Sequence, residues 1–123
     1  MPPDIPLATT RRRSYGGRMD ARKQGLAWLE VIGPDLLALR DAGIGRMFGS
    51  DSYSVRGKLF AFVSSDGALV VKLPAERIEQ LGLSNMVMRG SVMREWATVP
   101  LDDTARWRAV AVEAHAFVDS ITP

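Results

Sequence analysis

The apolar positions between residues 43 and 73 follow a pattern that is typical of short antiparallel strands. Residues 52–55 alternate between small polar and apolar side chains, with the period of two expected of a half-buried strand. Residues 58–64 are apolar on both faces, which favours an inner strand. The apolar run at 68–73 stops at Pro74, whose missing N–H cannot extend a ladder. This stretch therefore predicts a meander, around which the rest of the chain is built.

Glycines mark the predicted turns of this meander. A break at residues 49–51 separates residues 45–48 from the next strand, and Arg56-Gly57 supplies a tight two-residue turn. Asp66-Gly67 is a stronger hairpin signal, because the twist of paired strands favours turns whose residues have positive φ. We therefore expect two hairpins that share the strand at 58–64.

Apolar residues spaced three or four apart predict a helix over residues 19–42. Gly33-Pro34 interrupts this pattern and leaves open either two shorter helices or one kinked helix. Asp41-Ala42-Gly43 is the expected stop, because Gly43 can adopt the left-handed conformation that ends many helices.

Four further elements are expected after the meander. They are a short helix at 74–82, strands at 84–90 and 93–99, and a helix at 102–121. The last helix carries an apolar stripe that should cover one face of the sheet, and Asp102 or Asp103 is its expected cap. The stripe comprises Trp107, Val110, Ala111, Ala114, Phe117, Val118 and Ile121.

Length and composition place the chain among ordinary globular proteins. Its 123 residues suit one domain, and 46% hydrophobic with 24% charged residues is usual for such a domain. The absence of cysteine excludes a disulfide framework and thiolate metal sites. No apolar run approaches the roughly 20 residues of a membrane span. We therefore expect a cytoplasmic protein that does not insert into a membrane.

The basic charge of the chain is concentrated near its N-terminus. Residues 1–24 hold six basic and two acidic side chains, so the net charge of +2 leaves residues 25–123 slightly acidic. Prolines, glycines and few apolar residues predict a flexible arm over residues 1–18. This arm is either an unstructured extension or a contact for anionic partners through its three consecutive arginines.

Four local strings resemble the TfoX N-terminal domain family and its YjbR-like relatives. They are residues 46–50 (RMFGS), 57–61 (GKLFA), 69–74 (LVVKLP) and the Glu95-Trp96 pair before the last helix. The resemblance implies a small domain whose helices pack on an antiparallel sheet, in a two-layer architecture akin to secretion chaperones. The family is named after a regulator of natural competence, and many members have no assigned activity. A full-length regulator has a second, C-terminal domain, which we expect to be absent here.

Pattern and resemblance together predict an α+β fold in two layers, with helices packed on an antiparallel sheet of about five strands. A single domain is expected over residues 19–123. The family strings can be explained without reference to a function. Met47 and Phe48 would supply core volume, and Gly49 and Gly57 would turn the chain.

The sequence lacks the usual motifs of catalysis, cofactor binding and metal binding. His115 is the only histidine, so it cannot build a zinc site with other imidazoles, and a packing or surface role is expected for it. Neither a Gly-x-Ser-x-Gly elbow nor a Gly-x-Gly-x-x-Gly fingerprint occurs. We therefore assign no catalytic residue, no cofactor and no metal site.

Lys58 and Lys72 are the polar residues that call for an explanation. Each cation lies within a largely apolar strand, so it must reach solvent, pair with a carboxylate or face a ligand. In adjacent antiparallel strands the two lysines could lie near one another. Met86 and Met88 are either core filling or an adaptable binding surface. Together with Arg94, these residues form the predicted interaction surface.

These observations favour a non-enzymatic module that binds a protein partner or a second copy of itself, through an edge strand or the methionine-rich segment 86–93. The alternative is a regulatory protein that contacts DNA or RNA through Arg11, Arg12 and Arg13. In that case deletion of residues 1–18 should abolish binding, and affinity should fall steeply with salt. A third class, an enzyme, would require a polar pocket around the cations named above or around His115.

Overall fold

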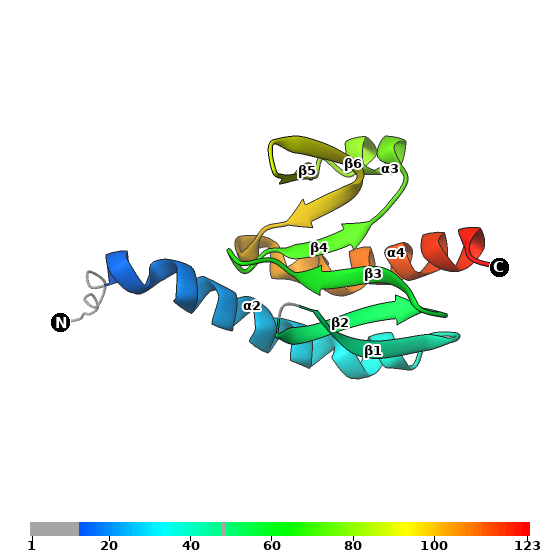
Figure 1. Cartoon of the computed structure of the whole chain (residues 1–123), viewed down its shortest axis with the longest axis horizontal. Helices are drawn as coiled ribbons and strands as arrows, with labels where there is room; N and C mark the ends of the chain where they lie inside the picture. The colour runs from blue at the N-terminus through cyan, green and yellow to red at the C-terminus, as the bar shows by residue number, and fades with distance from the viewer. Residues whose placement is uncertain (1–12, 48) are drawn as a thin grey trace.

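A computed structural model describes residues 13–47 and 49–123, and it contains helices packed against a six-stranded antiparallel sheet (Figure 1). The strands are β1 (Ala42–Met47), β2 (Ser50–Val55), β3 (Lys58–Val63), β4 (Leu69–Lys72), β5 (Ser84–Met88) and β6 (Ser91–Val99). They lie in the order β1-β2-β3-β4-β6-β5, so β1 and β5 are the edges. The predicted α+β class is confirmed. About five strands were expected, and the additional one is β1, which forms by pairing with β2.

The predicted meander is confirmed, because the first four strands pair in succession. β3 is an inner strand, as its apolar faces indicated. Arg56-Gly57 forms the predicted tight turn, and the φ angles of 46° and 86° suit the twist of the paired strands. At the next turn Gly67 has a φ of 87°. That loop is longer than two residues, since the Ser64 N–H donates to the Ala68 carbonyl oxygen.

The helices all pack against the sheet. They are α2 (Arg13–Leu37), α3 (Ala75–Gln80), the 3₁₀ helix η1 (Leu101–Arg106) and α4 (Trp107–Ile121). In Figure 1 the long helices α2 and α4 run across the same face of the sheet, whereas α3 lies near β6 and β5.

The start of α2 differs from its prediction. The helix begins at Arg13, so residues 13–18 are helical rather than part of an arm. Residues 1–12 of the predicted arm lie outside the described part of the chain. A glycine inside a helix costs only about 1 kcal/mol relative to alanine, which explains why Gly16-Gly17 does not interrupt the long helix.

The end of α2 also differs. The helix continues through Pro34 as a single element and ends at Leu37, not at residue 42. Asp41 takes a positive φ of 55° and turns the chain. Ala42 and Gly43, which were expected to stop the helix, pair instead with β2. The hydrogen bonds of the β1–β2 ladder therefore stabilise these residues more than a continuation of the helix would.

The predicted cap of the last helix is wrong. Residues 101–106 form η1, and α4 begins only at Trp107. Neither Asp102 nor Asp103 makes a side-chain capping hydrogen bond. The Asp103 carboxylate accepts from Arg106 Nε at 2.8 Å instead, and its own φ of −127° breaks the helical run.

Strand pairing separates the two faces of the sheet. Ala61, Val71 and Ala97 are aligned across β3, β4 and β6, and they are buried on the face that the helices cover. Val63, Leu69 and Val99 form the next row of this face. The core from α2 is Leu29, Ile32 and Leu36. The predicted stripe of α4 is buried except that Phe117 is partly exposed and Ile121 is exposed.

The opposite face carries a second, smaller apolar layer. Phe62, Val70 and Thr98 are aligned across three strands on this face, and Lys72 is paired with Trp96. The rings of Phe62 and Trp96 lie 5.9 Å apart and are tilted by 59°. Phe62 and Val70 are buried although they do not belong to the main core. Trp96 thus marks the helix-free side of the sheet.

Arg56 joins three parts of the fold. From the β2–β3 turn its guanidinium donates to Asp41 Oδ2 at 2.7 Å, to Asp119 Oδ1 at 2.8 Å and to the Thr122 carbonyl oxygen at 2.7 Å. The hydrogen bond from Arg56 is the main reason that the pKa of the Asp119 carboxyl lies below its usual value. This cluster connects the loop after α2 to the end of α4.

Candidate functional site

The pairing between β5 and β6 is interrupted in the middle. Near the turn Val87 pairs with Val92 and Met86 with Met93, but the next residue of β5, Asn85, pairs with Ala97. One step along β5 therefore corresponds to four steps along β6, and residues 94–96 have no partner on β5. Such a bulge redirects side chains that a regular strand would alternate between the two faces.

Hydrogen bonds hold this bulge in place from both sides. The Asn85 Nδ2 group donates to the carbonyl oxygens of Met93 at 3.2 Å and Arg94 at 3.1 Å. On the β4 side the Leu73 N–H donates to the Glu95 carbonyl oxygen at 3.0 Å. The Asn85 amide thereby satisfies two backbone acceptors of the bulge, and the Leu73 contact continues the pairing of β6 with β4.

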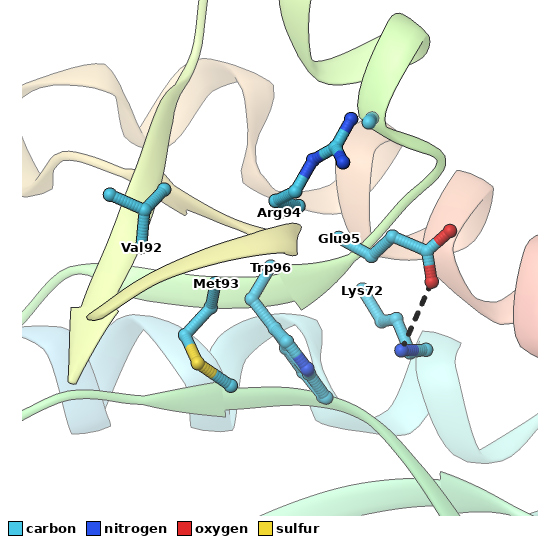
Figure 2. Close-up of a pocket in the computed structure, with 7 residues that line it drawn as sticks. Lys72, Val92, Met93, Arg94, Glu95 and Trp96 are labelled. Carbon is cyan, nitrogen blue, oxygen red and sulfur yellow. Dashed lines mark ion pairs between the residues drawn. The ribbon is translucent and has the colours of Figure 1, made fainter.

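The bulge opens a pocket of about 570 Å³, which we call the Trp96 groove. Its lining residues are Lys72, Ala75, Val92, Met93, Arg94, Glu95 and Trp96. Figure 2 shows that the Met93 and Trp96 side chains extend to the same side of the strand, whereas Arg94 projects to the other side. This volume lies within the range of roughly 300–1,000 Å³ that is usual for ligand pockets.

Lys72 lies between an acid and an aromatic ring. Its Nζ is 3.5 Å from Glu95 Oε1, as the dashed line in Figure 2 indicates, and 5.2 Å from the centroid of the Trp96 ring. An ammonium in this position is attracted by the negative face of the indole. The cation that the sequence placed in an apolar strand is therefore paired with a carboxylate and also lines a pocket.

A second pocket, of about 280 Å³, adjoins the Trp96 groove, because Lys72 and Trp96 line both. Lys58 and Leu59 of β3 line it from the sheet. Its other lining residues come from the end of the chain and are Val118, Ile121, Thr122 and Pro123. Lys58 and Lys72 thus face a common pocket, although they are not a cross-strand pair, because β3 and β4 pair only from Ala61 onward.

Unpaired cations are found mainly around these pockets. Within residues 25–47 and 49–123, the lysines and arginines that form no ion pair with a carboxylate are Lys58, Arg89 and Arg94. Lys58 and Arg94 line the two pockets, and Arg89 lies in the β5–β6 turn. Glu95, which lines the Trp96 groove only, is the single acidic side chain among the residues that line the two pockets. The local charge is therefore positive, whereas residues 25–123 as a whole are slightly acidic.

The end of the β5–β6 hairpin is apolar and exposed. Val87 and Val92, which pair across the two strands, are each 60% exposed, and Met88 is 40% exposed. We call Val87, Met88 and Val92 the hairpin tip. Because β5 is an edge strand, the tip lies beside unpaired backbone groups. Met86 is less exposed than the tip and pairs with Met93.

The other predicted candidates lie elsewhere. His115 is buried on α4, donates from Nε2 to the Arg40 carbonyl oxygen at 2.7 Å and meets the Phe60 ring edge-on. It packs against the helix-covered face and does not line the Trp96 groove. Arg11 and Arg12 lie outside the described residues, and Arg13 is the first residue of α2.

Two residues of the site, Trp96 and Asn85, were not part of the predicted interaction surface. Trp96 was expected only to fit a strand, although Glu95-Trp96 belonged to the strings that carried the family resemblance. Asn85 had no signal at all, because its role depends on a bulge between two strands. The site as a whole offers cations beside an apolar surface, which suits the binding of an anionic group attached to an apolar body.

Within the described part of the chain, no cluster of three or more acidic, histidine or cysteine side chains is arranged to hold a metal ion. Among the same residues, no helix combines the length and apolar character that a membrane crossing requires. Comparison of the chain with protein-family models, with curated proteins and with solved structures finds no match. The resemblance to the TfoX N-terminal domain family therefore stays a prediction.

Proposed function

We propose that this chain is a non-enzymatic interaction module and that the hairpin tip is its contact surface for a protein partner or a second copy of itself. The observation that carries the proposal is the exposure of the Val87–Val92 pair on an edge hairpin. Burial of apolar surface contributes about 25 cal/mol per Å², so a partner that covers these side chains gains free energy. The unpaired N–H and C=O groups of β5 offer further contacts.

The lining of the Trp96 groove supports a binding role over a catalytic one. It includes no serine, threonine, cysteine or histidine side chain that could act as a nucleophile or as a general base. Its one carboxylate, Glu95, is engaged by Lys72. The proposal assigns the module to the cytoplasm, in keeping with its cysteine-free sequence.

Exchange of Val87 and Val92 for serine tests the proposal. Size-exclusion chromatography with light scattering over a range of concentrations measures self-association, and binding to a co-purified, identified and then purified protein measures hetero-association. Val31→Ser is the matched control, because Val31 on α2 is 61% exposed but lies away from the hairpin. We expect the double variant to lose association and the control to keep it. A monomeric wild type without any partner, or equal losses in both variants, would refute the proposal.

The same chromatography with short duplex DNA tests the alternative suggested by the arginine cluster at residues 11–13. Because α2 begins at Arg13, the deletion should remove residues 1–12 and leave the helix intact. Co-elution with DNA that disappears in the deleted form and at moderate salt would favour the nucleic-acid function instead.

A further inference from the structure

We infer that the Trp96 groove and the adjoining hairpin recognise an acidic segment of a partner protein that also carries apolar side chains. The inference rests on the proposed function and specifies the chemistry of the partner. Two independent observations carry it, namely the position of the unpaired cations and the apolar surface of the groove and the hairpin.

The charge of the site is the first observation. Lys58 and Arg94 line the two joined pockets and Arg89 lies at the turn of the hairpin, and none of the three has a carboxylate partner among the described residues. The other cations of residues 25–47 and 49–123 are paired. A ligand with carboxylates supplies the missing charge, and the planar guanidinium of Arg94 can donate two parallel hydrogen bonds to one carboxylate.

The apolar surface is the second observation, and it favours a peptide. Val92, Met93 and Trp96 line the Trp96 groove, and the exposed Val87 and Met88 extend this apolar surface along the hairpin. Aliphatic or aromatic side chains of a bound peptide would be buried here, whereas a free inorganic anion would leave this surface in water.

Trp96 is poorly placed for nucleic acid. A base that stacks on an indole needs an open ring face. The Lys72 ammonium lies 5.2 Å from the centroid of this ring, and Phe62 packs against it at 5.9 Å. A backbone-tracking site also needs a longer row of cations than these pockets supply. The aromatic side chain therefore serves as an apolar wall and not as a stacking platform.

Glu95 occupies a position that the ligand would compete for. Its carboxylate is partly exposed and stays 3.5 Å from Lys72 Nζ, which is longer than a close charge-assisted hydrogen bond. An incoming carboxylate meets repulsion from Glu95 and attraction from Lys72. Removal of the Glu95 charge should therefore strengthen binding, whereas removal of the Arg94 charge should weaken it.

Selection of short random peptides displayed on phage against the full chain identifies the preferred chemistry directly. We expect enrichment of peptides that combine aspartate or glutamate with aliphatic or aromatic residues. Fluorescence anisotropy then measures the dissociation constant of the most enriched peptide. Arg94→Gln should weaken binding about two- to fivefold and Glu95→Gln should strengthen it by a similar factor, as for partly exposed ion pairs. Arg46→Gln, on the opposite edge strand, is the control and should change nothing.

The outcomes separate this inference from the proposed function. Enrichment of uncharged or basic peptides, or of none, overturns the inference. Binding that depends on Val87 but not on Arg94 also overturns the inference, but it remains consistent with the proposed interaction module. Because the Glu95→Gln variant is expected to gain affinity, a failure to fold cannot imitate the predicted result.

Discussion

α2 passes so close to the β3–β4 turn that only glycine backbone fits between them. A Cβ atom on Gly67 would overlap the Ala21 carbonyl oxygen and lie 2.7 Å from its carbonyl carbon. A Cβ atom on Gly25 would overlap the Gly67 carbonyl oxygen and lie 2.9 Å from the Gly67 Cα. Real Cβ atoms keep at least 3.0 Å from such atoms, so Gly67→Ala requires the helix or the turn to move.

Gly57 provides a matched control for this contact. Its φ of 86° is nearly that of Gly67, at 87°, but a Cβ atom on Gly57 would meet nothing within 4 Å. Gly57→Ala therefore carries only the cost of a left-handed alanine, about 1–2 kcal/mol. Gly67→Ala carries the same cost plus about 1–3 kcal/mol for the overlap in a packed region. The effect of alanine on the unfolded chain is common to both variants and cancels in the comparison.

Urea unfolding of the full chain measures both variants. We expect Gly67→Ala to lower the free energy of unfolding by about 2–5 kcal/mol and to exceed the loss in Gly57→Ala by about 1–3 kcal/mol. The slope of the free energy with urea should stay the same, since the surface exposed on unfolding is unchanged. Equal losses in the two variants would refute the close packing of α2 against this turn.

Three further predictions concern the bulge and two titratable groups. Asn85→Ala removes both hydrogen bonds to the bulge and should lower the free energy of urea unfolding by about 1–2 kcal/mol; an unchanged value would mean that water replaces the amide. The hydrogen bond from Arg56 lowers the folded-state pKa of Asp119 below its usual 3.8, so its stabilisation is present above that value and is lost as pH falls through the folded-state pKa. The unfolding free energies of wild type and Asp119→Asn should therefore converge in acid. A difference between them that does not change with pH would contradict this. Burial, with smaller contributions from Asp51 and Glu30, raises the pKa of the Tyr53 phenol above its usual 10. The stability that the neutral phenol contributes is present below pH 10 and is lost as pH rises through the folded-state pKa. The alkaline absorbance titration should therefore contain an ionisation step above the usual tyrosine pH, and Tyr53→Phe should remove that step.

Much of the fold could be predicted because it depends on short-range rules. The alternation at 52–55, the apolar run of β3 and the turn at Arg56-Gly57 each follow from the conformations of a few neighbouring residues. The apolar stripe of α4 likewise follows from the helical period. The strands, the turn and the apolar stripe occur where the sequence placed them, although α4 begins at Trp107 and not at residue 102.

Element boundaries were wrong where a distant partner decides them. Gly43 was expected to end a helix, yet its position opposite Ser54 in the ladder makes it part of β1. For Gly43 a local preference for a helix end competes with several ladder hydrogen bonds that exist only in the folded chain. The expected cap at Asp102 or Asp103 was wrong for a local reason, because both residues lie within η1 and Asp103 pairs with Arg106, three residues further on.

The candidate site depends on the tertiary structure more than the individual strands and helices do. The sequence by itself identified Lys58, Lys72 and Arg94 as cations in or near apolar strands. It did not place β6 between β4 and β5, and this order brings Trp96 beside Lys72. It also did not reveal the bulge that Asn85 holds open. Local periodicity determines which segments become strands, whereas the neighbours of a strand and the breaks in its ladder arise from contacts between residues far apart in the chain.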